Sequence, residues 1–218
     1  MEHFNLPKRT AVNRVIPKNA FEKYTNSKQQ KLFTEKILRI TWTHKLSVKT
    51  INLSGEEVQE IQLFKIELKE FSTITPILEI IDKSIPYPII FWVQHQDYVY
   101  LSTSAKHLHP IKENMSVIDW TFTTNWSDLK AITQYQLNLK KNLEEIYKDF
   151  CLQLSGKTAL STQSLTAIVE NEQAIDALEK KIDKLKGQIK RSKQFNKKVA
   201  LNIELREIED QLKKIISN

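Results

Sequence analysis

The sequence is poor in glycine and cysteine, and both shortages exclude whole classes of site. Its three glycines, Gly55, Gly156 and Gly187, stand far apart in 218 residues. A loop that cradles phosphate needs glycines within a few residues of one another, because the backbone must approach the phosphate closely. The single cysteine, Cys151, excludes an intramolecular disulfide and a zinc site built on cysteine pairs. The sequence therefore argues against Walker-type nucleotide sites, dinucleotide fingerprints and kinase-like glycine-rich loops.

Metal-binding motifs and long apolar runs are also missing. None of the five histidines takes part in a His-Glu-x-x-His motif, which excludes zincin chemistry. The longest apolar run, residues 86–93, covers about eight residues, whereas a membrane-spanning helix needs roughly twenty. The first residues also lack the uninterrupted apolar core of a signal peptide. We expect a soluble, cytoplasmic protein that contacts no membrane and requires neither a metal nor another cofactor.

The first part of the chain, residues 1–128, has the pattern of a mixed-sheet α/β domain. It contains all six prolines and all four tryptophans. Segments of alternating polarity or short apolar runs predict strands, and segments with helical spacing of apolar residues predict helices. The predicted strands are residues 38–44, 58–68, 89–93, 98–102 and 117–123, and the predicted helices are residues 28–38 and 75–85. This order predicts an α+β fold with an α/β-type mixed sheet.

The second part of the chain has strong helical periodicity and no proline. Residues 129–160 predict a connecting helix packed on the first domain, and residues 161–218 predict a pair of helical arms. Two apolar seams with the three–four spacing of a coiled coil run through the arms: Ile175, Leu178, Ile182, Leu185 and Ile189, then Leu201, Leu205, Ile208, Leu212 and Ile215. If the first seam continued along the same helix, the second seam would be offset from it by two residues. A continuous supercoil absorbs slips of three or four residues, and two is not one of them. We therefore predict an antiparallel coiled-coil hairpin with its turn near residues 193–198. The alternative is one long helix that forms a homodimer.

Positive charge is concentrated at this predicted turn. Residues 180–198 contain nine basic residues and one acid, a net +8, so the rest of the chain sums to −1 against the total of +7. Such a segment suits phosphate binding through counterion release, and Phe195 in its middle could stack on an unpaired base. The alternative is that Phe195 closes the hairpin and the lysines keep it soluble. The residues predicted to bind nucleic acid, which lie in the segment called here the basic tip (residues 186–198), are Lys186, Lys190, Arg191, Lys193, Gln194, Phe195, Asn196, Lys197 and Lys198.

Five segments spread over the chain resemble a known bacterial family. They are Phe4–Pro7, Val15–Lys18, Ile40–Leu46, Ile80–Pro88 and Lys193–Val199. The chain is similar, on these residues, to the family called domain of unknown function 4391. Members of that family tend to be encoded beside helicase and DNA-methylase genes in restriction or antiphage loci. The resemblance implies an accessory part in DNA-handling defence, with a helicase or methyltransferase as partner, and it supplies no catalytic residues.

One short motif leaves an enzymatic alternative open. Glu67-Leu68-Lys69 ends a predicted strand, where metal-dependent nucleases of the restriction type place a Glu-x-Lys that holds Mg²⁺ and positions the attacking water. Such a site needs a second carboxylate, because Mg²⁺ prefers several oxygen ligands. The strand at residues 38–44 has no acid, so Glu57 or Glu60 would have to substitute.

Other residues of chemical interest have structural interpretations. His107 and His109 predict a surface loop rather than a metal site, and Asp119 has no partner that the sequence identifies. Cys151 lies on the apolar side of a helix and is expected to be buried and inert.

These observations favour one function over two others. We expect a non-enzymatic accessory subunit that docks a helicase or methyltransferase and contacts DNA or another nucleic acid through the basic tip. The alternatives are a protein-interaction module without nucleic-acid binding, and a Mg²⁺-dependent nuclease that uses Glu67 and Lys69.

Overall fold

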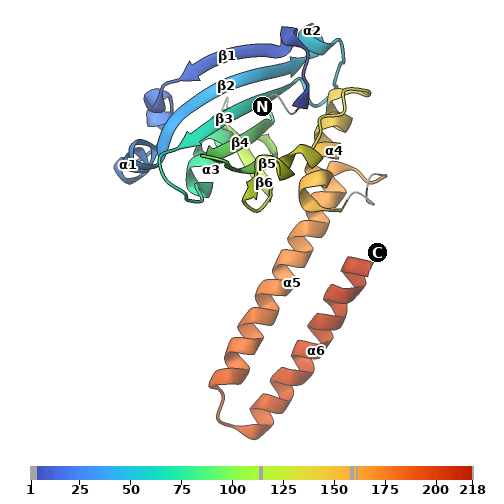
Figure 1. Cartoon of the computed structure of the whole chain (residues 1–218). Coiled ribbons are helices and arrows are strands. Elements are labelled where there is room, and N and C mark those ends of the chain that lie inside the picture. Colours follow the sequence, from blue (N-terminus) through green and yellow to red (C-terminus); the bar gives the residue numbers. More distant parts are fainter. Residues whose placement is uncertain (1–3, 113–114, 158–159, 161, 218) are drawn as a thin grey trace. The chain divides into compact units, whose positions relative to one another are not determined.

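In the computed structural model the chain divides into two units, residues 1–162 and residues 163–218 (Figure 1). The structure describes residues 4–112, 115–157, 160 and 162–217. The first unit, called here the body, holds the sheet, and the second, called the helix pair, consists of two long helices.

A mixed sheet forms the centre of the body. Over the described residues its strands are β1 (Ala11–Ile16), β2 (Ile37–Ser47), β3 (Glu60–Leu68), β4 (Ile89–His95), β5 (Tyr98–Leu108), β6 (Ser116–Thr123) and β7 (Ser127–Asp128). Strands β1 to β6 lie in the order of the chain, and β7 pairs with β5. Among the strands of the described residues, only β3 and β4 pair in parallel; the other pairs are antiparallel. The predicted α+β class with a mixed sheet is therefore confirmed.

The helices begin and end where local capping chemistry favours it. The α-helices are α1 (Ser27–Lys36), α2 (Val48–Ile51), α3 (Thr75–Lys83), α4 (Leu143–Ser155), α5 (Leu165–Arg191) and α6 (Phe195–Ser217), and the 3₁₀ segments are η2 (Lys8–Thr10), η3 (Lys18–Tyr24) and η4 (Ala131–Gln134). Asn26 accepts a hydrogen bond from the backbone N–H of Gln29, whose side chain returns one to the Asn26 N–H, a capping box that starts α1. Pro76 lies in the first turn of α3, where its missing N–H costs nothing.

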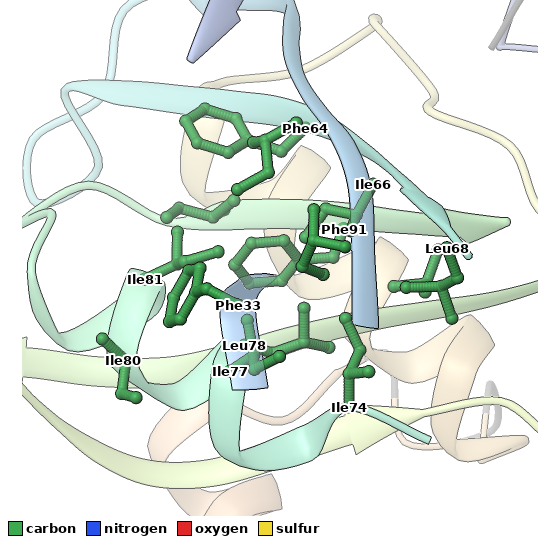
Figure 2. Close-up of a cluster of buried hydrophobic side chains, with 14 of the residues drawn as sticks. Phe33, Phe64, Ile66, Leu68, Ile74, Ile77, Leu78, Ile80, Ile81 and Phe91 are labelled. Carbon is green, nitrogen blue, oxygen red and sulfur yellow. The ribbon is translucent and has the colours of Figure 1, made fainter. Parts of the chain in front are cut away.

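Helices cover both faces of the sheet. On one face, apolar side chains of α1 and α3 pack on β3 and β4 (Figure 2). This cluster includes Phe33, Phe64, Ile66, Leu68, Ile74, Ile77, Leu78, Ile80, Ile81 and Phe91. On the other face, the Phe4 ring lies edge-on to both Trp92 of β4, at 6.0 Å, and Phe150 of α4, at 5.8 Å. The core therefore has two layers, one on each side of the strands.

The body differs from the sequence prediction in three places. Strand β1 occupies a segment predicted as an extended arm; it pairs with β2 alone and is mostly exposed, so it lacks the alternation that marks a half-buried strand. Strand β5 continues to Leu108, six residues past the predicted end at Ser102, because Ser and Thr side chains replace the apolar residues expected in a buried strand. Helix α4 starts at Leu143, not near Leu137, because the Asn142 side chain accepts the Glu145 N–H and caps it.

In the second unit, α5 and α6 lie side by side and pack through one apolar cluster (Figure 1). Ile182, Leu185 and Ile208 are buried in it, and Leu178, Leu201, Leu205 and Leu212 pack around them. All seven belong to the two predicted seams. None of the described helices combines the length and the apolar composition that a membrane crossing requires.

Candidate nucleic-acid interface

A short break separates the two long helices and creates the basic tip. The backbone N–H of Ser192 bonds to the carbonyl of Gln188 at 3.0 Å, and Ser192 itself is extended, so α5 ends at Arg191. The first bond of α6 runs from the Lys198 N–H to the Gln194 carbonyl at 3.1 Å. The alternative of one continuous helix is wrong. The turn lies at residues 192–194, earlier than the predicted 193–198, because residues 195–198 already form the first turn of α6.

All nine residues predicted to bind nucleic acid are exposed, but the six basic residues among them differ in how their charges are compensated. The Lys186 ammonium lies 3.3 Å from the Glu209 carboxylate, and the Arg191 Nε donates to the Gly187 carbonyl at 3.1 Å. The ammonium groups of Lys190, Lys193, Lys197 and Lys198 have no ion pair among the residues that the structure describes. Residues 184–203 contain seven bases and no acid. Five cations, at positions 190, 191, 193, 197 and 198, therefore remain uncompensated by acids around the break.

Phe195 is the first residue of α6, and its side chain is 78% exposed. It takes no part in the apolar cluster that joins α5 to α6. The interpretation that Phe195 closes the helix pair is therefore wrong, because Ile182, Leu185 and Ile208 perform that role. Phe195 therefore presents an exposed aromatic ring in a segment of the sequence that is rich in cations.

The Glu67-x-Lys69 motif lies at the end of β3, as predicted, but cations surround its acid. The Glu67 carboxylate lies 3.3 Å from the Lys65 ammonium and 4.0 Å from the Arg39 Nε. The Lys69 ammonium donates to the Thr34 carbonyl at 2.8 Å. Glu60 pairs with Lys45 at the opposite end of β3, about 23 Å away at 3.3 Å per residue, and Glu57 precedes the strand. Neither acid therefore lies beside Glu67 as the second carboxylate that the nuclease alternative would need.

The remaining sequence candidates are engaged in structural contacts. The His107 Nδ1 lies 2.9 Å from an Asp119 carboxylate oxygen across β5 and β6, which supplies the partner that the sequence did not reveal. Cys151 is fully buried, and burial raises the pKa of its thiol well above the ordinary value, as expected for an inert thiol. Among the described residues, no group of three or more His, Cys, Asp and Glu side chains is arranged to hold a metal ion.

The body contains a buried ion pair that sequence analysis missed. The side chains of Lys106 in β5 and Asp82 in α3 are each about 1% exposed, and their Nζ and Oδ1 atoms lie 2.6 Å apart. The same ammonium donates to the carbonyls of Asp82 and Ile85, each at 2.7 Å, so all three of its protons are used. Burial raises the pKa of Asp82 and lowers the pKa of Lys106, and the ion pair opposes both shifts. This arrangement anchors the end of α3 to the sheet.

The body also presents an exposed aromatic cluster, defined as Phe71, His95, Tyr98 and Trp126. The Phe71 ring lies 4.5 Å from Trp126, 5.7 Å from Tyr98 and 6.2 Å from His95, between ring centroids. Phe71 is 54% exposed and Tyr98 is about half exposed. These residues follow β3, end β4, start β5 and precede β7, so only the folded sheet brings them together. Large exposed aromatic groups of this kind are typical of protein interaction sites.

Comparison with known families assigns the chain to one of them. Residues 4–212 match the family described as Domain of unknown function (DUF4391). Because this match covers nearly the whole chain, the protein belongs to that family. Neither the curated proteins nor the solved structures yield a match.

Proposed function

We propose that the protein is a non-enzymatic accessory subunit of a bacterial DNA restriction or antiphage system. In this proposal the basic tip contacts nucleic acid, and the body docks a helicase or methyltransferase. The observation that carries the nucleic-acid contact is the group of five cations without acidic partners around the exposed Phe195. The resemblance on which the defence role rests extends over both units of the chain.

The helix pair serves in this proposal as an antiparallel coiled-coil hairpin that presents the tip. Its seams have the three–four spacing of a coiled coil, and seven seam residues form the cluster between α5 and α6. Ion pairs of Lys181 with Glu204 and of Lys186 with Glu209 connect the helices beside this seam, at 3.6 and 3.3 Å. Acids are confined to positions before 184 and after 203. The positive potential of the helix pair is therefore greatest where the chain turns.

The nucleic-acid role is tested by reversing the charge of Lys190, Arg191, Lys193, Lys197 and Lys198 to Glu. Counterion release from a single strand makes each phosphate contact worth roughly fivefold in affinity at 0.1 M salt relative to 1 M. The loss of two or more contacts should therefore weaken binding to a labelled single-stranded oligonucleotide by about 25-fold or more at 0.1 M salt. An unchanged affinity would exclude the tip from nucleic-acid binding.

A matched control exists on the body. Lys8, Arg9, Lys28, Lys49 and Lys140 are exposed, have no ion pair within the described ranges, and comprise one Arg and four Lys, as the tip set does. Their reversal to Glu changes the net charge by the same −10. If both variants lose affinity equally, the effect reflects overall charge and not the tip.

A second candidate function, a protein-interaction module without nucleic-acid binding, is favoured by the aromatic cluster on the body. Exposed aromatic side chains bury large areas when a partner covers them and often dominate the binding energy. Both functions allow the body to dock a protein, so they differ in whether the wild-type protein binds an oligonucleotide. In the first case it binds and charge reversal at the tip disrupts the binding; in the second case no oligonucleotide binds the wild-type protein.

A further inference from the structure

We propose that the basic tip binds single-stranded nucleic acid in preference to a duplex, with Phe195 stacking on an unpaired base. This inference rests on the proposed nucleic-acid contact and specifies its ligand. The exposed Phe195 ring carries the preference for a single strand, and the five cations carry the nucleic-acid contact itself.

The position of Phe195 gives its ring free access from solvent. The residue begins α6 directly after the break at residues 192–194, and the apolar cluster between the helices is formed without it. On a helix, side chains three positions apart lie on the same face, so Lys198 lies on the face of Phe195. Lys193 precedes the ring by two residues. The ring therefore has a cation on each side of it along the chain.

This alternation matches the chemistry of an unpaired strand. Every base of a single strand offers a face on which an aromatic ring can stack, and a phosphate follows each base. In a duplex both faces of each base are covered by its neighbours, so a ring can reach them only after unstacking. The tip can approach a duplex through its cations alone.

The surroundings of the ring argue against a protein as its partner. Residues 184–203 contain seven bases and no acid, and charged residues are depleted in the cores of protein interfaces. A protein that covered Phe195 would have to compensate these charges while burying them. Phosphates compensate them and remain largely in solvent.

The experiment compares labelled oligonucleotides by fluorescence anisotropy. The probes are one single-stranded DNA, its RNA counterpart, and the duplex DNA of the same sequence. The variants are Phe195→Ala, Phe195→Trp and the control Ile203→Ala, which removes another exposed apolar side chain of α6, 56% exposed. We expect tighter binding of the single strands by wild type.

We expect Phe195→Ala to weaken single-strand binding by about 5- to 150-fold, which corresponds to about 1–3 kcal/mol at 1.4 kcal/mol per tenfold. Its duplex affinity and its salt dependence should change less than about twofold, because no cation is removed. Phe195→Trp should retain single-strand binding, and Ile203→Ala should match wild type. A loss of affinity of Phe195→Ala for either the DNA or the RNA single strand supports the inference.

Two results overturn the inference while leaving the proposed function intact: equal affinity for strand and duplex, or an unchanged single-strand affinity in Phe195→Ala. In both cases the five-residue charge reversal still abolishes binding. If wild type binds none of the three probes, the proposed nucleic-acid contact itself is wrong.

Discussion

The buried pair of Lys106 and Asp82 should be the most sensitive polar contact of the body. Replacing Lys106 with Met keeps a side chain of similar length but removes all three hydrogen bonds of the ammonium, at 2.6, 2.7 and 2.7 Å. Asp82 then retains an uncompensated carboxylate at about 1% exposure. Removing one partner of a buried pair costs about 3–5 kcal/mol. For a unit of this size the melting temperature should fall by roughly 6–20 °C, at about 2–4 °C per kcal/mol.

The charge left on Asp82 gives this loss a defined pH dependence. Without Lys106, burial raises the pKa of Asp82 in the folded protein above its unfolded value. A group with a raised folded pKa contributes its stability at low pH and loses it as the pH rises through the folded pKa. The penalty of Lys106→Met should therefore be smaller at acidic pH, where Asp82 is protonated in both states, and should grow toward neutral pH.

Urea unfolding followed by circular dichroism measures these changes in the free energy of unfolding. The double variant Asp82→Asn, Lys106→Met should be about 1–2 kcal/mol more stable than Lys106→Met alone, because the unpaired charge is gone. Lys83→Met is the matched control on α3; its ammonium pairs with Glu79 at 3.2 Å on the surface, so the cost should stay below about 1 kcal/mol. A loss below about 1 kcal/mol for Lys106→Met, or additive effects in the double variant, would refute this reasoning.

Three further predictions concern the body. Although burial alone raises the pKa of Glu144, hydrogen bonds from the N–H groups of Val58 and Glu57, at 2.9 and 2.8 Å, lower it below the ordinary value. Glu144→Gln should cost about 1–2 kcal/mol in urea unfolding at pH 7. This difference should shrink as the pH falls below about 4, since stability from a lowered pKa is lost as the carboxylate protonates. A difference that stays constant with pH would contradict this prediction. Incubation with Mg²⁺ should leave DNA uncut in both wild type and Glu67→Gln, because Arg39 and Lys65 face the Glu67 carboxylate; cleavage by wild type alone would identify a nuclease. Phe71→Ala combined with Tyr98→Ala should abolish co-purification of a helicase or methyltransferase from the native host while the tip charge reversal retains it; retention by the aromatic variant would exclude that cluster as the docking site.

Local signals were sufficient to predict most of the elements. The capping box at Asn26 and the proline at position 76 place α1 and α3 within two residues of their predicted bounds. The basic tip was predictable for the same reason, because its charges and its ring are close in sequence. Strand β1 was missed because an exposed edge strand has no reason to alternate in polarity.

Contacts between distant segments could not be predicted. Lys106 and Asp82 are 24 residues apart, and only the packing of α3 on the sheet brings them together. The partnership of His107 and Asp119 depends on the register of β5 and β6. The aromatic cluster joins four separate segments where β3 and β4 end and β5 begins. Each of these contacts follows from strand order and register, which no single sequence segment specifies.

The salt dependence of oligonucleotide binding tests the role of the basic tip most directly. Five phosphate contacts to a single strand predict a slope of about −3.5 for log affinity against log salt concentration, or a fall of about 130-fold between 50 and 200 mM salt. Reversal of the charges at positions 190, 191, 193, 197 and 198 should bring that slope close to zero. A variant that retains the wild-type slope would show that the phosphates are bound elsewhere on the protein.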